Sequence, residues 1–344
     1  MASHRRPKQP SRTRVTVLTT AAAAAVALSA NAANAAPSEK LGKGEVKAKV
    51  DKLYEQAEQA TEKYNGAKEK QQKLQKEIST IQDNVARGQQ ELNKLRDSLG
   101  SLATAQYRSG GIDSSVQLFL SSNPDDFLDK ASTLDQLSSQ QVEALKKIQD
   151  KQRELAQERA EAAEKLKDLA ATRTELGNKK KEVQGKLADA QKLLNTLTAK
   201  EKAALAAEQQ RADRSSTERV DIGKDAPASG RAGAAFSAAQ SQIGKPYVYG
   251  ATGPSSYDCS GLTSWAYAQA GVSIPRTSEA QANIGTRIGS VNDLQVGDLV
   301  FFYGDLHHVG LYAGNGQVLH APHTGAVVRY EAMSDMPFQF GVRV

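Results

Sequence analysis

The only cysteine of the 344-residue chain is Cys259, in the stretch "YDCSGLTSWAYAQAG". The apolar residues after it recur on one helical face: Leu262, Trp265, Ala266 and Ala270. Asp258 suits an N-cap, so Cys259 is predicted in the first helical turn. There, unpaired backbone N–H groups and the helix dipole favour a thiolate. We therefore interpret Cys259 as a reactive thiol; the alternative is a small buried side chain.

A nucleophilic thiolate needs a general base. Four of the five histidines lie within residues 307–323. His307 and His308 are neighbours on a predicted strand and face opposite sides, so only one can serve Cys259. Cysteine and histidine are also zinc ligands, but the sequence lacks the C-x-x-C and H-x-x-x-H spacings typical of zinc sites. We expect no metal and no cofactor.

The turn between the histidines decides which of them meet. If Gly314–Gly316 forms a three-residue hairpin loop, Ala313 pairs with Gln317 and Gly310 faces His320. His308 and His320 then become diagonal neighbours on one face, close enough for their rings to share a hydrogen bond. A two-residue loop would instead set His308 opposite His323. The first register predicts a Cys-His-His arrangement.

The elements around these residues predict an α+β domain at residues 233–344. A helical segment, a Gly/Tyr/Pro loop and the helix after Cys259 come first, and strand-like runs follow. This order favours helices packed on an antiparallel sheet. The predicted strands are "DLVFFY", "HVGLYAG", "QVLHA", "AVVRYE" and "FGVRV". The polar, Ser/Pro/Gly-containing residues 208–232 are interpreted as a flexible linker.

Residues 40–207 have the composition of long helices, rich in Ala, Glu, Lys, Gln and Leu. From Val46 to Leu99, apolar residues recur at alternating steps of four and three, the heptad pattern of a coiled coil. A second register runs from Leu145 to Leu197 with polar interruptions. We expect an antiparallel hairpin; an intermolecular coiled coil is the alternative.

Residues 107–137 interrupt the heptads and form the predicted tip of the hairpin. Gly110-Gly111 is expected to end one helix and Asn123-Pro124 to open the next. The apolar run "VQLFL" would either cap the hairpin or dock a partner. The tip resembles those of coiled-coil domains in cell-division peptidoglycan hydrolases and activators of the PcsB, CwlO and EnvC kind. That resemblance implies an FtsEX-type membrane transporter as partner.

The first 35 residues have the pattern of a secretion signal. A basic opening precedes "VTVLTTAAAAAVALSA", which is too short to span a bilayer comfortably, and Ala33 and Ala35 fit an A-x-A cleavage site. An uncleaved anchor is the alternative. The chain's formal net charge is +6 and five of its positive charges lie in this segment, so the remainder is close to neutral. We therefore expect a secreted, cell-wall-associated protein without nucleic-acid binding.

Residues 235–344 resemble the NlpC/P60 family of papain-like cell-wall cysteine peptidases. The resemblance rests on "GKPYVYGATGPSSYDCSGLTSWAY", "IPRTSEAQ", "LQVGDLVFF" and "HHVGLYAGNGQVLHAP", in that order. It implies that Cys259 is the nucleophile, His308 the general base and His320 the residue orienting it. The alanine in "ATGPSS" stands where the family usually has a second glycine.

The resemblance also assigns roles around the nucleophile. Tyr247 would position Cys259 and shape the oxyanion site, while Asp258 and Ser260 would recognise the stem peptide, Asp258 through a free L-alanine amine. The N-cap alone would also explain Asp258. Arg276 would meet a substrate carboxylate, or be an idle exposed loop residue.

The family's reaction is hydrolysis of the bond between D-γ-glutamyl and a diamino acid in peptidoglycan stem peptides. We expect this D,L-endopeptidase activity, restrained or localised by the hairpin, in wall remodelling or cell separation. The alternatives are a non-catalytic wall-binding division activator and a papain-like amidase or acyltransferase.

Overall fold

The computed structural model describes residues 41–108, 116, 124–215 and 230–344. The predicted signal peptide and its cleavage site lie outside the described residues, as do residues 109–115 and 117–123 of the predicted tip. Within the described ranges, every helix is too short or too polar to cross a bilayer.

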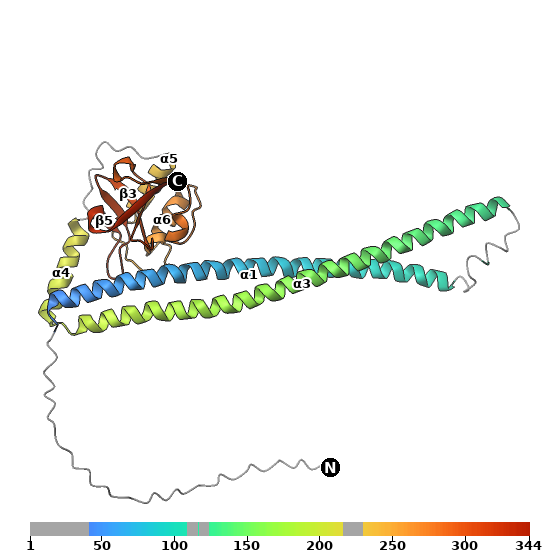
Figure 1. Ribbon diagram of the computed structural model, residues 1–344, viewed down its shortest axis with the longest axis horizontal. Helices are drawn as coiled ribbons and strands as arrows, with labels where there is room; N and C mark the ends of the chain where they lie inside the picture. Colours follow the sequence, from blue (N-terminus) through green and yellow to red (C-terminus); the bar gives the residue numbers. More distant parts are fainter. Residues whose placement is uncertain (1–40, 109–115, 117–123, 216–229) are drawn as a thin grey trace, which may run out of the picture. The chain divides into compact units, whose positions relative to one another are not determined.

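Two long helices form the N-terminal part: α1 spans Lys43–Arg108 and α3 spans Pro124–Asn195. Figure 1 shows them side by side. In the first half of α3, Ile148 and Leu155 pack on Leu92 of α1. Further along α3, Leu169 packs on Leu74 and Ile78, which come earlier on α1. Partner numbers fall along α3 as they rise along α1, so the pair is antiparallel. The predicted long helical region is confirmed.

The apolar seam of this pair follows the heptads with local exceptions. Gly88 allows a close approach, because a Cβ there would lie 2.7 Å from Leu155 Cδ2. Leu145 and Leu166, which the sequence placed in the second register, are each 48% exposed. The polar interruptions of α3 explain these exceptions, because they leave the helix without a continuous apolar stripe.

Residues predicted as linker are partly helical. Helix α4 spans Ala199–Ser215 and therefore runs into the predicted linker, and α5, Gly230–Gln240, begins before its predicted end. A capping box opens α4: the Thr198 backbone N–H donates to Glu201 Oε2 (2.9 Å), and the Glu201 N–H donates to Thr198 Oγ1 (3.3 Å). This reciprocal cap explains why a helix begins just after α3.

The C-terminal domain combines three helices with one antiparallel sheet. After α5 come α6, Cys259–Gln269, and the short α7, Ser278–Gln281. The strand order is β1-β6-β2-β3-β4-β5. The strands are β1 Thr286–Ile288, β2 Leu299–Phe302, β3 His308–Gly314, β4 Gln317–His320, β5 Arg329–Ala332 and β6 Phe338–Arg343, with short 3-10 turns at Val291–Asp293 and Met333–Asp335. The predicted α+β arrangement is confirmed; β1 was not predicted.

Alternation along the strands divides the core between the two faces of the sheet. Leu311 of β3 joins the larger cluster, with Leu262 and Ala266 of α6, whereas the next residue, Tyr312, joins a second cluster with Phe302. Helix α6 is thereby fixed to the sheet by its apolar face, which holds its N-terminus at the edge of the domain's core.

The β3–β4 hairpin sets the relation between the two central histidines. Leu311 pairs with Leu319, so Gly310 lies opposite His320, as predicted. The hairpin closes on Gly314 and Gln317 through a bulge, so the predicted Ala313–Gln317 pair is wrong. Gly310 leaves the space that His320 needs, since a Cβ there would lie 2.4 Å from Val318 Cγ2 and 3.0 Å from His320 Cβ.

Candidate active site

Cys259 is the first residue of α6 and is fully buried. The preceding Asp258 is the N-cap, and its Oδ1 accepts a hydrogen bond from the Gly261 backbone N–H at 2.7 Å. The cap holds the thiol at the helix N-terminus, as the sequence predicted.

The structure brings the thiol and the two predicted histidines together. A ring nitrogen of His308 lies within 4.8 Å of Cys259 Sγ. On its other side, His308 Nε2 lies 2.7 Å from His320 Nδ1, with the two rings edge to face. Both histidines are buried, and His307 points away to Asp305 and stacks on Tyr303. The geometry is that of a nucleophile, a base and an orienting group in series.

Tyr247 is buried in the same core cluster as Cys259 and is bridged to Tyr257. Burial raises the pKa of its hydroxyl well above the ordinary value, and the nearby charges of Glu58 and Cys259 raise it further. A neutral phenol therefore stands close to the thiol, where it can donate a hydrogen bond.

Asp258, Ser260 and Arg276, the predicted substrate-binding residues, form one network. Arg276 Nη2 donates to Asp258 Oδ2 at 2.6 Å and Nη1 donates to Ser260 Oγ at 2.7 Å. The arginine side chain is only 18% exposed, so it is not the idle exposed residue that the sequence left open. Asp258 acts as N-cap and as the arginine's ion-pair partner at once.

Three polar residues of α1 enter this site, and the sequence analysis missed them: Glu58, Glu62 and Asn65 are all buried. Asn65 Nδ2 donates to Asp258 Oδ2 at 3.0 Å. The Glu58 carboxylate is hydrogen-bonded to His308 Nδ1, the nitrogen that His320 does not use.

Glu62 lies against the nucleophile. Its Oε1 accepts a hydrogen bond from Ser260 Oγ at 2.7 Å and lies 3.8 Å from Cys259 Sγ. Its Oε2 accepts from the Ser278 backbone N–H at 2.7 Å and from Ser278 Oγ at 3.1 Å. One carboxylate of α1 thus fills the space beside the thiol, and the other separates the thiol from its base.

These carboxylates change the acidity of the site. Burial raises the pKa of the Cys259 thiol well above its ordinary value, and the charges of Glu62 and Glu58 raise it further. This arrangement therefore does not favour the predicted thiolate, because burial and the acidic groups together outweigh the helix N-terminus. Burial and Asp258 raise the pKa of Glu62 to about 7, against the hydrogen bonds from Ser260 and Ser278.

The histidines differ in charge. Burial alone would lower the pKa of His308, but the Glu58 carboxylate outweighs it and the pKa is raised. Burial lowers the pKa of His320 to about 4, although Glu331 acts against it. His308 is accordingly an imidazolium paired with Glu58, beside a neutral His320.

The same atoms have the chemistry of a zinc site. Glu58, Cys259 and His308 each bring one donor atom within 4.8 Å of the others, and all three residue types bind zinc. Two of these three groups, Glu58 and His308, are however already hydrogen-bonded to each other.

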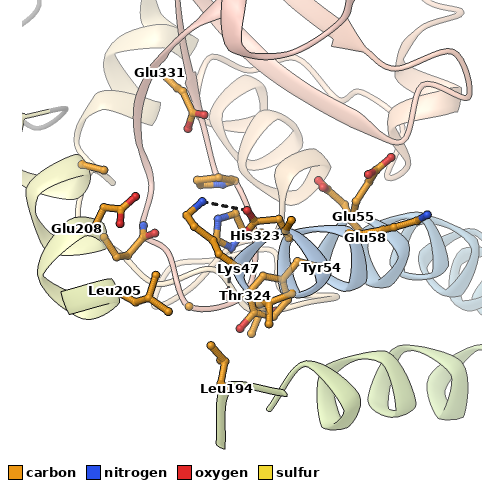
Figure 2. A pocket seen from close by; sticks show the side chains of 18 of the residues that line it. Lys47, Tyr54, Glu55, Glu58, Leu194, Leu205, Glu208, His323, Thr324 and Glu331 are labelled. Atoms are coloured by element: carbon orange, nitrogen blue, oxygen red, sulfur yellow. Dashed lines mark hydrogen bonds and ion pairs between the residues drawn. The ribbon is translucent and has the colours of Figure 1, made fainter. Parts of the chain in front are cut away.

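A cavity of about 990 Å³ opens beside the two histidines. Figure 2 shows its lining from α1, with Tyr54 and Glu58, from α4, with Glu208, and from the C-terminal domain, with His323 and Glu331. Tyr54 stacks on His323 with ring centroids 5.2 Å apart. The cavity leaves room for a ligand next to the two histidines, and Glu62 is not among the residues that line it.

Comparison with known proteins agrees with this geometry. Residues 244–341 match the NlpC/P60 family. A probable endopeptidase of Corynebacterium glutamicum is 51% identical over 118 residues, which are 34% of this chain and 56% of that protein. The probable endopeptidase p60 of Listeria monocytogenes is 50% identical over 95 residues, which are 27% of this chain and 19% of that protein. The chain thus spans about half, or less, of these relatives' length.

Among solved structures, the crystal structure of the NlpC/p60 domain of the peptidoglycan hydrolase SagA is 34% identical. The match covers 33% of this chain and 98% of that domain, with a TM-score of 0.32. Residues 244–341 of the chain are thus an NlpC/P60 domain.

Proposed function

We propose that the chain is a peptidoglycan D,L-endopeptidase that hydrolyses the bond between D-γ-glutamyl and the diamino acid of stem peptides. The observation that carries this proposal is the thiol at a helix N-terminus within 4.8 Å of one nitrogen of a histidine whose other nitrogen is 2.7 Å from a second histidine. This is the arrangement of an activated nucleophile, and the family membership supports the substrate class.

The reaction begins with proton transfer from Cys259 Sγ to His308 Nδ1. The thiolate attacks the γ-glutamyl carbonyl carbon, and the negative charge moves to the carbonyl oxygen. Backbone N–H groups at the start of α6, with Tyr247 nearby, stabilise that oxyanion. The tetrahedral intermediate collapses as His308 returns its proton to the leaving amine.

A thioester to Cys259 remains after the amine leaves. His308, again neutral, takes a proton from water, and the resulting hydroxide attacks the thioester carbonyl. The products are the γ-carboxyl group of D-glutamate and the free thiol, which receives the proton from His308. No metal or cofactor takes part in these steps.

The substrate class also fits the groups beside the thiol. A γ-linked glutamyl residue keeps its α-carboxylate free, and the site already accommodates a carboxylate, that of Glu62. The Ser260 hydroxyl and the Ser278 backbone N–H donate to it at 2.7 Å each. When α1 is absent, the same donors and Arg276 can hold the substrate's carboxylate, while Asp258 faces a free amine.

The position of α1 supports a latent enzyme. The Glu58 carboxylate replaces the thiolate as the partner of the His308 imidazolium, so the Cys259–His308 ion pair cannot form. Glu62 excludes substrate from the same place. Release of α1 is therefore a requirement for turnover in this proposal.

The location and partner complete the proposal. A basic, then apolar N-terminal segment with an A-x-A site supports secretion and association with the wall. An FtsEX-type membrane transporter acting on the hairpin tip would be a means of moving α1 away from Cys259. Restraint until recruitment suits an enzyme that could otherwise damage its own wall.

The test is incubation of the full chain and of residues 230–344 with defined muropeptides, read by mass spectrometry, with Cys259→Ala versions as controls. Circular dichroism checks that each protein is folded. We expect cleavage between D-glutamate and the diamino acid, absent from both controls and faster in the shorter protein. Equal rates would leave the hairpin as a tether only.

Two other outcomes would overturn the assignment. Binding to wall without any product would support the non-catalytic division activator. Cleavage of a different amide would support the amidase alternative. The first alternative gives no product and the second gives a different one, so the same incubation separates them.

A further inference from the structure

We propose that Glu331 is a positioning residue that fixes the tautomer of His320 and, through it, directs the basic nitrogen of His308 toward the thiol. The inference rests on the proposed peptidase mechanism and extends it by one residue. Neither the sequence motifs nor the spacing of the histidines had singled out Glu331.

The sheet places the three side chains in one row. His308 is on β3, His320 on β4 and Glu331 on β5, which are adjacent strands. Val318 pairs with Glu331 and His320 with Arg329, so His320 and Glu331 are diagonal neighbours on one face. The row therefore follows from strand register, not from a mobile loop.

The distances form a continuous chain of hydrogen bonds. His308 Nε2 lies 2.7 Å from His320 Nδ1, and His320 Nε2 lies 3.2 Å from Glu331 Oε2. Arg329 holds that oxygen from the other side, with Nη2 at 2.8 Å and Nε at 3.2 Å. Arg329 Nη1 also donates to Asp213 of α4 at 2.8 Å, which limits the arginine's own freedom.

The charges of these groups decide where the protons lie. Burial alone would raise the pKa of Glu331, but His320 and Arg329 outweigh it and keep the carboxyl ionised. An ionised carboxylate only accepts hydrogen bonds. A neutral His320 must then carry its single proton on Nε2, facing Glu331, and its Nδ1 must accept.

The consequence reaches the base. Because His320 Nδ1 accepts, His308 Nε2 must donate, and this leaves the lone pair of neutral His308 on Nδ1, the nitrogen that faces Cys259. The opposite tautomer of His320 would place the His308 proton on Nδ1. That proton would point at the thiol, and His308 could not act as a base.

The test is nitrogen NMR of histidine-labelled full chain, which has only five histidines. An imidazolium His308 would itself donate to His320 Nδ1, so the spectra are recorded at a pH above the raised pKa of His308, where that ring is neutral. For the unmodified protein we expect a protonated Nε2 and an unprotonated Nδ1 at His320. In Glu331→Leu we expect a mixture of tautomers or the opposite one. Glu331→Gln keeps an accepting oxygen on a side chain of the same length, so His320 should retain the original tautomer in most molecules.

Turnover of a defined muropeptide gives the second readout. We expect Glu331→Leu to lower kcat by about 10- to 100-fold, the usual effect of losing a group that orients a ligand or base, with KM unchanged. Glu331→Gln should recover most of that loss. Glu279→Leu is the matched control, because Glu279 is the domain's only other glutamate and is exposed.

The outcomes separate this inference from the proposed function. An unchanged His320 tautomer in folded Glu331→Leu would overturn the positioning role, whatever the turnover. A tautomer that changes as expected in a protein without any peptidase activity would keep the positioning role and count against the peptidase. If Glu331→Leu does not fold, Glu331→Ala takes its place: a changed His320 tautomer in folded Glu331→Ala, with the original tautomer kept in Glu331→Gln, supports the inference, and an unchanged tautomer in Glu331→Ala contradicts it.

Discussion

Carboxylates from two distant regions of the chain reach the site of Cys259, His308 and His320. Glu58 and Glu62 come from α1, and Glu331 comes from β5. Burial and the neighbouring Asp258 raise the pKa of Glu62 to about 7. Glu331 is also largely buried, yet His320 and Arg329 hold its pKa well below the ordinary range. The pKa values of two buried acids at one site are therefore shifted in opposite directions.

The difference lies in their partners. Glu331 has a fixed cation, Arg329, so its charge is compensated within the sheet. Glu62 has neutral donors and lies beside another acid, with Arg276 already committed to Asp258. A buried charge without adequate compensation destabilises the arrangement that buries it. In the proposed latent enzyme, the β5 carboxylate therefore belongs to the active site itself, whereas the α1 carboxylates belong to the contact that opens.

The largest effect is expected from reversing the charge at α1. Glu58→Lys would place an ammonium group against the His308 imidazolium, and disrupting a buried pair in this way costs about 3–5 kcal/mol. In the full chain, hydrolysis of muropeptide should rise by at least about 100-fold. Glu69→Lys, an exposed position on the same helix, should leave the rate unchanged. An unaltered rate in Glu58→Lys would contradict a latency imposed by α1.

The second effect is a pH dependence of α1 release. The pKa of Glu62 is about 7 in the closed arrangement and near 4.5 when exposed, so the closed form binds the proton more tightly. Closure is therefore strongest below about pH 4.5, weakens as the pH rises to about 7, and changes no further above it. Each pH unit inside this window changes the closing equilibrium by up to about tenfold.

His308 acts in the same direction. Its pKa is raised by Glu58 in the closed arrangement, so its contribution to closure is complete below its ordinary pKa and is lost as the pH rises through the raised value. Glu62→Gln, which mimics the neutral acid, separates the two groups. The ratio of wild-type to Glu62→Gln turnover should be near one at pH 4.5 and rise to a plateau above pH 7. A constant ratio would exclude Glu62 as the titrating group.

A third effect should appear on the β5 side as lost stability. Arg329→Leu removes the cation that compensates Glu331 and leaves a largely buried carboxylate without it, at a cost of about 1.5–3 kcal/mol for the charged hydrogen bonds. Calorimetry of the full chain should show a Tm lower by several degrees. The Arg329→Leu/Glu331→Leu pair should lose less than the sum of the two single changes. Strict additivity would mean that the two side chains do not support each other.

The sequence predicted the parts of the site that lie within one domain. Cys259 follows an N-cap and opens an apolar helical face, and the spacing from His308 to His320 fits one hairpin. These are local signals, because strand alternation and helix periodicity determine which side chains share a face. The bulge near Ala313 was not predicted, because the glycines of the loop allow the hairpin to close at Ala313 or at Gly314 without altering the histidine pairing.

The α1 residues could not be predicted in this way. Glu58, Glu62 and Asn65 fall outside the apolar heptad positions, where polar residues ordinarily face solvent. Their burial depends on a contact between residues some 200 positions apart, such as Asn65 with Asp258. No periodicity within α1 distinguishes them from exposed glutamates of the same helix. The role of Glu331 was also not predicted, because it becomes visible only once the pairing of β4 with β5 is known.

The smallest effect is expected at an ion pair between α1 and α3, away from the site. Glu77 on α1 accepts from Lys165 on α3 at 2.7 Å, and each side chain is about one-third exposed, at 33% and 31%. The lysine lowers the pKa of Glu77, but water and salt screen such a pair. Glu77→Gln should shift the Tm of the full chain by no more than about one degree, and high salt should remove the difference. A loss as large as that of Arg329→Leu would show that ion pairs, and not the apolar seam at Leu74 and Leu169, hold the hairpin together.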